Sequence, residues 1–215
     1  MKAVFPAFDG FALTVTGQSE RIDTKRLLDV VLAGLLLVLC FPVLALVSLA
    51  VALESPGPVL FCQKRTGRCG KTFPIFKFRS MHVMEDDAHI KQACKGDVRI
   101  TRVGRVIRKL SLDELPQLIN VLSGDMSLVG PRPHAVAHDI EYGAAISNYA
   151  VRQRVRPGIT GWAQVNGARG ATPTIQIMQD RVNLDAWYVE HAGLALDLTI
   201  LARTPLEVLR TRNAH

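Results

Sequence analysis

The sequence lacks the features that mark small secreted domains and compact metal sites. Its four cysteines include no Cys-x-x-Cys pair, so neither a disulfide framework nor a zinc site is indicated. A secretory signal is also missing, because residues 1–20 hold one lysine and no long apolar core. We expect residues 1–20 to form a flexible leader before one compact unit, since 215 residues are too few for two full-sized enzymatic domains.

Acidic residues are outnumbered by basic ones. The chain has 26 Lys and Arg against 19 Asp and Glu, a formal net charge of +7, which favours nucleic acid, acidic lipid or a phosphorylated substrate as the partner. No helix-turn-helix, zinc finger or aromatic RNA-binding motif accompanies this charge, so we expect no nucleic acid partner. In the polar segment 85–97, His89 and Cys94 are spaced too widely for a compact metal site with His82.

One long segment has no charge at all. Residues 30–53 read VVLAGLLLVLCFPVLALVSLAVAL, and as a helix these 24 residues would be roughly 36 Å long, enough to cross a hydrocarbon core of about 30 Å. The alternative is a buried helix of a soluble protein. A helix that is apolar on every side would need burial all round, which a chain of this size has little protein to supply. Membrane insertion is therefore favoured.

The charges beside this segment predict its topology. Basic residues lie on both sides, at Arg21, Lys25 and Arg26 before it and Lys64, Arg65 and Arg68 after it. The positive-inside rule places both flanks in the cytoplasm, and Pro42 would kink the helix near its middle. We expect residues 21–54 to form a re-entrant membrane hairpin bent at Pro42. A single crossing is the alternative.

The remaining chain, 55–215, is expected to be a cytoplasmic catalytic domain. The turn SPGP leads into VLFCQKR and FPIFKFRSM, two runs typical of strands, joined by a hairpin loop between Gly67 and Gly70. A basic amphipathic helix is predicted over 99–110, because arginines recur every third residue opposite an apolar stripe.

Further helices are predicted beyond residue 110. Ser111 and Glu114 have the spacing of a capping box, and Pro116 must kink or restart that helix. Loops rich in Gly and Pro follow, and residues 185–210 predict one or two helices broken at Pro205. The expected fold class is α+β, mainly helical, with little sheet.

Two adjacent acids are the candidate centre of the chemistry. Asp113 and Glu114 could simply cap a helix. However, a carboxylate can attack phosphorus, and a second carboxylate can hold a divalent cation beside a diphosphate. Arg132 lies between two prolines, and the PGITG loop at 157–161 offers backbone amides, so the chain has the groups that bind phosphate oxygens.

Four ordered blocks resemble one protein family. They are KRLLDVVLAGLLLVLCFPVLAL, KFRSM, SLDELPQLINVLSGDMSLVGPRP and RPGITGWAQVNG, and they are similar to the bacterial sugar transferases, monotopic polyprenyl-phosphate phosphoglycosyltransferases. The resemblance covers about residues 25–209. In that family a proline-bent re-entrant helix often has a serine before the proline, whereas Phe41 precedes Pro42 here. The chain resembles the minimal form, without an additional multi-pass domain.

The resemblance implies an enzyme that forms a covalent phosphosugar on an aspartate and passes it to undecaprenyl phosphate, releasing UMP from a UDP-sugar. Asp113 matches the nucleophile, Glu114 the acid associated with Mg²⁺, and Arg132 the residue that engages the nucleotide diphosphate. The further substrate-binding candidates are Lys77, Arg79, Arg108, Gly158 and Thr160. Asp185 and Tyr188 belong to a recurring C-terminal pattern for which the sequence indicates no role.

The same resemblance implies the cellular setting. The expected location is the cytoplasmic face of the bacterial inner membrane, and the product would begin a repeat unit of exopolysaccharide, capsule or O-antigen. The identity of the sugar and the oligomeric state stay open, with a homodimer among the candidates. Two alternatives remain: a membrane-anchored lipid-binding scaffold without catalysis, and a direct transfer without a covalent intermediate.

Overall fold

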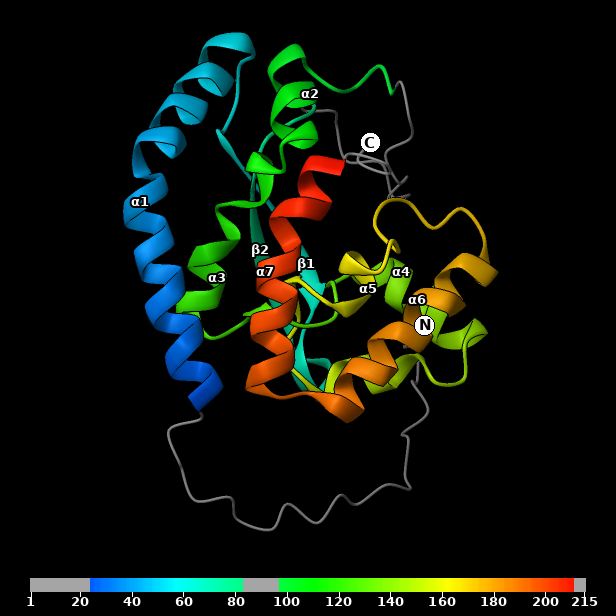
Figure 1. Cartoon of the computed structure of the whole chain (residues 1–215). Coiled ribbons are helices and arrows are strands. Elements are labelled where there is room, and N and C mark those ends of the chain that lie inside the picture. Colours follow the sequence, from blue (N-terminus) through cyan, green and yellow to red (C-terminus); the bar gives the residue numbers. More distant parts are fainter. Residues whose placement is uncertain (1–23, 83–96, 211–215) are drawn as a thin grey trace.

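A computed structural model describes residues 24–82 and 97–210 of the chain. The expected leader at 1–20 and most of the polar segment 85–97 lie outside the described residues. The helices and strands are, in chain order, α1 (Thr24–Glu54), β1 (Leu60–Thr66), η1 (Arg68–Gly70), β2 (Thr72–Phe78), α2 (Arg102–Lys109), η2 (Leu112–Glu114), α3 (Gln117–Ser123), β3 (Ser127–Val129), α4 (Val136–Ala145), η3 (Tyr149–Arg154), β4 (Gly158–Thr160), α5 (Trp162–Val165), α6 (Ile175–His191) and α7 (Leu194–Arg210). Figure 1 shows a mainly helical arrangement around a small amount of strand, as expected.

Two short sheets organise the centre. β1 and β2 form the predicted antiparallel hairpin, in the register Leu60 to Phe78 through Thr66 to Thr72. β3 and β4 form a parallel pair, in which Ser127 is opposite Gly158 and Val129 is opposite Thr160. The main core lies around these strands and includes Phe73, Ile75, Leu118, Val121, Met126, Leu128, Tyr188 and Ile200. α7 and α3 pack at this core, between α1 and the rest of the domain (Figure 1).

α1 presents a largely uncovered apolar surface. Every residue between Ala33 and Val47 is at least partly exposed, and Val38, Leu39 and Leu46 are 76, 71 and 68% exposed. Only 11% of an apolar 18-residue stretch of α1 is buried, whereas the core helix of a soluble protein is mostly buried. By length and composition α1 could cross a membrane, and its uncovered surface is suited to contact with hydrocarbon.

α1 continues through Pro42 as one bowed helix (Figure 1). It is not divided into two antiparallel arms in this structure. The expectation that both of its flanks lie in the cytoplasm stays a prediction.

Both ends of α1 are attached to the same domain. Near its start, Lys25 Nζ contacts Asp197 Oδ2 at 2.5 Å, and the Asp29 carboxylate, only 1% exposed, accepts from the Leu128 amide at 2.9 Å. At its end, Glu54 Oε1 accepts from the Arg102 amide at 2.7 Å. Since a helix of 31 residues is about 46 Å long, these contacts tie two distant points of α1 to one body.

Several expected helix boundaries are wrong. The amphipathic helix is shorter than predicted, because Thr101 caps it by accepting from the Gly104 amide at 2.8 Å. α7 continues through Pro205, and the break comes instead at Ala192 and Gly193, between α6 and α7. α7 is held to β4 beside that proline, because the hydroxyls of Thr204 and Thr160 are 2.8 Å apart. Packing therefore maintains the helix where propensity alone would end it.

Candidate active site

The turn between α2 and α3 places the two adjacent acids. Ser111 has φ of 57° and ψ of 21°, in the left-handed region, so the chain turns sharply after α2. Leu112–Glu114 then form a single 3₁₀ turn, and α3 begins at Gln117 after Pro116. The predicted capping box is wrong, because the Ser111 side chain makes no cap and its Oγ accepts from Arg169. The Glu114 carboxylate therefore contacts other residues.

Glu114 is held by two cations. Arg132 donates from Nη1 to Glu114 Oε2 at 3.0 Å and from Nη2 to Oε1, the bidentate geometry that makes arginine–carboxylate pairs strong. Lys77 Nζ, on β2, donates to Glu114 Oε1 at 2.9 Å. Burial raises the pKa of Glu114, but the charges of Arg132 and Lys77 outweigh that effect and hold this pKa well below its ordinary value. Glu114 is therefore ionised at neutral pH.

Asp113 differs from its neighbour in both contacts and charge. It is 8% exposed, and no residue in the described part of the chain donates a hydrogen bond to its carboxylate. Burial, followed by the negative charge of Glu114, raises the pKa of Asp113 to about 6, against the charges of Lys77, Arg108 and Arg132. Above that pH it is an ionised, poorly solvated carboxylate whose oxygens are available to a reacting group.

The arrangement places several cations around the Asp113 carboxylate. Arg132, Lys77, Arg108 and Arg169 approach the acids from four separate segments. These cations therefore surround the Asp113 carboxylate, which accepts no hydrogen bond from the described residues. This is the combination that attack on a diphosphate needs.

Comparison with known proteins agrees with this chemistry. A family model described as bacterial sugar transferase matches residues 20–211. The chain belongs to the bacterial sugar transferase family.

Named relatives of this sugar transferase share much of its length. A UDP-glucose:undecaprenyl-phosphate glucose-1-phosphate transferase from Caulobacter vibrioides is 54% identical over 191 residues, which cover 89% of this chain and 72% of that protein. A protein of the same name from Escherichia coli K12 is 53% identical, covering 84% of this chain and 39% of that protein. The exopolysaccharide production protein PSS from Rhizobium leguminosarum bv. phaseoli is 40% identical, covering 86% of this chain and 94% of that protein. The chain thus spans about two fifths of the Escherichia coli relative.

The structure brings only some of the expected site residues to the acids of the sugar transferase. Lys77 and Arg132 contact Glu114, and Arg108, in the last turn of α2, acts on the charge of Asp113. Arg169 is a site residue that sequence reasoning missed. The only signal for it is an arginine between two glycines, Gly167 and Gly170, both of positive φ, in a loop whose path no local pattern reveals.

Arg79 lies elsewhere. Its guanidinium donates to the carbonyls of Ser55 at 2.6 Å, Pro56 at 2.8 Å and Val51 at 3.4 Å, and it is 5% exposed. Lys77 and Arg79 share the motif KFRSM, but only Lys77 contacts Glu114. Arg79 instead binds one carbonyl in the last turn of α1 and two in the turn that follows it.

Gly158 and Thr160 lie in β4, which packs against the segment that carries Arg132. The Gly158 amide donates to the Pro131 carbonyl at 2.9 Å, contrary to the expectation of a bare amide. A Cβ on Gly158 would lie 2.1 Å from the Gly130 nitrogen, so only glycine allows this approach. The Thr160 hydroxyl is paired with Thr204. A direct role of these two residues in binding substrate stays a prediction.

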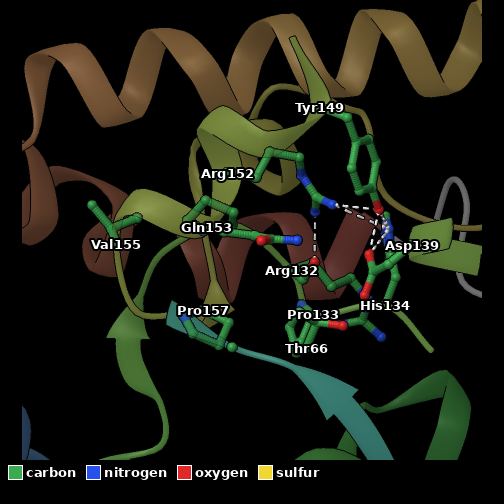
Figure 2. A pocket seen from close by; sticks show the side chains of 12 residues that line it. Thr66, Arg132, Pro133, His134, Asp139, Tyr149, Arg152, Gln153, Val155 and Pro157 are labelled. Carbon is green, nitrogen blue, oxygen red and sulfur yellow. Dashed lines mark hydrogen bonds and ion pairs between the residues drawn. The ribbon is translucent and has the colours of Figure 1, made fainter. Parts of the chain in front are cut away.

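A hollow lies beside the Arg132 main chain. Its empty space, which includes open solvent, is about 290 Å³, and its lining includes Thr66, Arg132, His134, Tyr149, Arg152 and Gln153. Figure 2 shows Arg152 and Tyr149 converging on the segment that carries Arg132 and His134. Burial, followed by the charge of Arg152, holds the pKa of His134 well below its ordinary value, so this ring is neutral at pH 7.

The donors at the acid pair fit the Mg²⁺ ion that the resemblance implies. Oε1 of Glu114 accepts from both Lys77 and Arg132, whereas Oε2 accepts from Arg132 alone among the described residues, which leaves a lone pair. Asp113 adds further carboxylate oxygens. Within residues 24–82 and 97–210 no group of three or more His, Cys, Asp or Glu could hold a metal by itself. Mg²⁺ commonly takes one or two carboxylates together with water and substrate phosphates, so the ion would share its ligands with the diphosphate.

Proposed function

We propose that this chain transfers a sugar 1-phosphate from a UDP-sugar to undecaprenyl phosphate, releasing UMP, through a covalent phosphosugar on Asp113. The observation that carries the proposal is the contrast within the acid pair. Glu114 is held by Arg132 and Lys77, whereas Asp113 is buried, close to cations and without a hydrogen-bond donor in the described chain. The family and the names of its relatives support the same reaction class.

In the first step an Asp113 carboxylate oxygen attacks the phosphorus that carries the sugar. A P–O bond forms to Asp113, the P–O bond to the UMP oxygen breaks, and UMP leaves with that electron pair. Arg132 and Lys77 would stabilise the charge that grows on the leaving phosphate. A pKa of about 6 leaves Asp113 mostly ionised at pH 7, which is the form that attacks.

In the second step a phosphate oxygen of undecaprenyl phosphate attacks the same phosphorus. The P–O bond to Asp113 breaks, the carboxylate is restored, and the product is a polyprenyl diphosphosugar. Mg²⁺ held by Glu114 and Asp113 would supply charge neutralisation at the diphosphate. Arg108 lies in α2, which packs against the C-terminal half of α1. Its positive charge would attract the acceptor phosphate toward Asp113.

The attachment of α1 supports a location on one face of the membrane. Lys25 and Asp29 anchor its start and Glu54 anchors its end to one domain. If that domain stays in the cytoplasm, both ends of α1 stay there too. The uncovered middle of the helix would then enter the cytoplasmic leaflet of the inner membrane without crossing it. This placement puts Asp113 where a soluble sugar donor and a lipid acceptor can meet.

The product would begin a repeat unit of a surface polysaccharide, and the Rhizobium relative, by name an exopolysaccharide production protein, supports a role in that kind of synthesis. UDP-glucose is the first sugar donor to test, because the Caulobacter and Escherichia relatives are named as transferases that use it.

The test is UMP release by the purified chain in nanodiscs with Mg²⁺, undecaprenyl phosphate and a panel of UDP-sugars. We expect lipid-dependent release from one sugar donor, ping-pong kinetics, and no release by Asp113→Asn. A protein-bound radiolabelled phosphosugar should accumulate when the lipid is left out. Full activity in Asp113→Asn would refute the nucleophile, and sequential kinetics would favour direct transfer. No release by folded, lipid-bound protein would favour the scaffold alternative.

A further inference from the structure

We propose that Arg152 and Asp185 form a positioning pair that fixes the main chain of Arg132 and so sets how well the sugar donor binds. The inference rests on the proposed function, because it assigns a role to residues that act on the diphosphate through Arg132. It also gives a role to Asp185, for which the sequence indicated none. Neither residue of the pair contacts Asp113 or Glu114 in the structure.

Arg152 connects three elements through one side chain. Its Nη2 donates to the Arg132 carbonyl at 2.6 Å, its Nε donates to Asp185 Oδ2 at 2.8 Å, and its Nη1 donates to the Tyr149 hydroxyl at 2.9 Å. The same Nη1 lies 3.2 Å from His134 Nδ1. Figure 2 shows the guanidinium lying between Tyr149 and the Arg132 main chain. Arginine alone among the side chains presents its donors in a rigid planar fork. A lysine at this position could not contact Asp185, Tyr149 and the Arg132 carbonyl in the same geometry.

Two prolines limit the main-chain hydrogen bonds that the segment around Arg132 can donate. Arg132 lies between Pro131 and Pro133, neither of which has an amide hydrogen to donate. The Pro131 carbonyl is held by the Gly158 amide, and the next carbonyl, that of Arg132, is held by Arg152. Two consecutive carbonyls are thus fixed from the η3–β4 region. The Arg132 side chain, 33% exposed, extends toward Glu114 from a backbone held at these two carbonyls.

The burial of this pair is difficult to explain by stability alone. Arg152 and Asp185 are 6% and 1% exposed. A buried ion pair loses much of its attraction to desolvation, and well-packed apolar residues are often as stabilising. Apolar residues, however, could not bind the Arg132 carbonyl. Asp185 also neutralises Arg152, so that the support of Arg132 does not add an unbalanced positive charge close to it.

The test compares Arg152→Lys and Asp185→Asn with a matched control, Arg156→Lys. Arg156 lies four residues further on, is partly buried, and donates to one main-chain carbonyl, that of Gly124 at 3.1 Å, without contact to Arg132. With ping-pong kinetics, kcat/KM for each substrate reports its own half-reaction. We expect Arg152→Lys to lower kcat/KM for the UDP-sugar by on the order of 10- to 100-fold, since small misplacements of a binding group have effects of this size.

The acceptor should respond differently. In Arg152→Lys, we expect kcat/KM for undecaprenyl phosphate to stay within about twofold of wild type. Asp185→Asn should lower kcat/KM for the sugar donor by less than Arg152→Lys does. Arg156→Lys should leave kcat/KM for both substrates unchanged. Equal losses for both substrates would indicate general damage to the fold and would overturn the proposal. If thermal unfolding shows that Arg152→Lys does not fold, kcat/KM for the two substrates is compared between Asp185→Asn and Arg156→Lys instead.

A double-mutant cycle tests whether the pair acts through Arg132. In an Arg132→Ala background, Arg152→Lys should cause no further loss of kcat/KM for the sugar donor, because the group that it positions is gone. Additive losses would refute the positioning role.

Hydrogen exchange separates this inference from the proposed function. In Arg152→Lys, peptides covering residues 127–136 should exchange faster than in wild type or Arg156→Lys, whether or not the protein has activity. Failure of the wild type to release UMP, together with faster exchange in these peptides, would refute the reaction and leave the positioning pair supported. Unchanged exchange would refute the pair.

Discussion

Asp113 and Glu114 are consecutive residues whose carboxyl pKa values are displaced in opposite directions. Burial, with the charge of Glu114, raises the pKa of Asp113 to about 6. For Glu114, burial acts in the same direction but is outweighed by Arg132 and Lys77. Paired acids whose pKa values are driven apart commonly have separate roles. Asp113 is therefore the member that titrates near working pH, while Glu114 keeps its charge.

The rate of the first half-reaction should depend on pH through Asp113. We expect kcat/KM for the sugar donor to be nearly constant above pH 7 and to fall about tenfold per pH unit well below 6, because only the ionised carboxylate attacks. Initial rates of UMP release from pH 5 to 8, at a UDP-sugar concentration below KM, provide the measurement. A constant rate down to pH 5 would contradict the assignment.

The same carboxyl should make the folded chain less stable. Its pKa is about 6 when folded against an ordinary value of 3.8. The folded state therefore binds the proton more tightly, and the free energy of unfolding decreases as pH rises from 3.8 to 6. At about 1.4 kcal/mol per unit, neutral Asp113→Asn could recover up to roughly 3 kcal/mol at pH 7.5. Thermal unfolding should show a higher Tm for this inactive variant, with a smaller difference at pH 5. A lower Tm at pH 7.5 would contradict the prediction.

Activity should require a divalent cation. The free lone pair of Glu114 Oε2 and the oxygens of Asp113 can share an ion with a diphosphate. We expect EDTA to abolish UMP release and Mg²⁺ to restore it. The effect of EDTA on Tm, measured in parallel, distinguishes loss of catalysis from loss of fold. Undiminished turnover in excess chelator would exclude a role for the metal.

Labelling of intact cells should find both ends of α1 on the same side. Thr24 and Cys62 are exposed and lie at the start of α1 and beyond its end. Two variants with a single cysteine are needed, one that keeps only Cys62 and one that has only Thr24→Cys. We expect each cysteine to react with a membrane-impermeant maleimide only after the cells are permeabilised. Reaction of either cysteine from outside would establish a crossing helix and refute the same-face topology.

Substitution of Arg79 should affect stability more than chemistry. Arg79→Ala removes donors from the carbonyls of Val51, Ser55 and Pro56, and leaving buried acceptors unpaired costs about 1–3 kcal/mol each. We expect a lower Tm and a nearly unchanged KM for the UDP-sugar in the folded fraction. The exposed Arg102→Ala serves as the control. A normal Tm with a raised KM would show that Arg79 binds substrate after all.

Local patterns predicted much of the fold. The alternation in β1 and β2 and the glycines between them predicted the hairpin, because strand periodicity and turn preference are properties of neighbouring residues. The unbroken apolar run predicted α1 for the same reason. Local rules failed at Ser111 and Pro205. Arg169 donates a hydrogen bond to the Ser111 hydroxyl, and Thr160 pairs with Thr204 of α7. Arg169 and Thr160 are both distant in the chain from the residues that they contact.

By itself, the sequence determined the long apolar helix, the adjacent acids, the arginine between two prolines and the family to which these blocks belong. Only the tertiary structure decided which basic residues meet Glu114, since Lys77 and Arg79 share one motif but have different partners. It also decided the environment of Asp113, because burial and the charges around it come from segments far apart in the chain. Contacts of this kind depend on how strands and helices pack, a property that no local pattern of residues encodes.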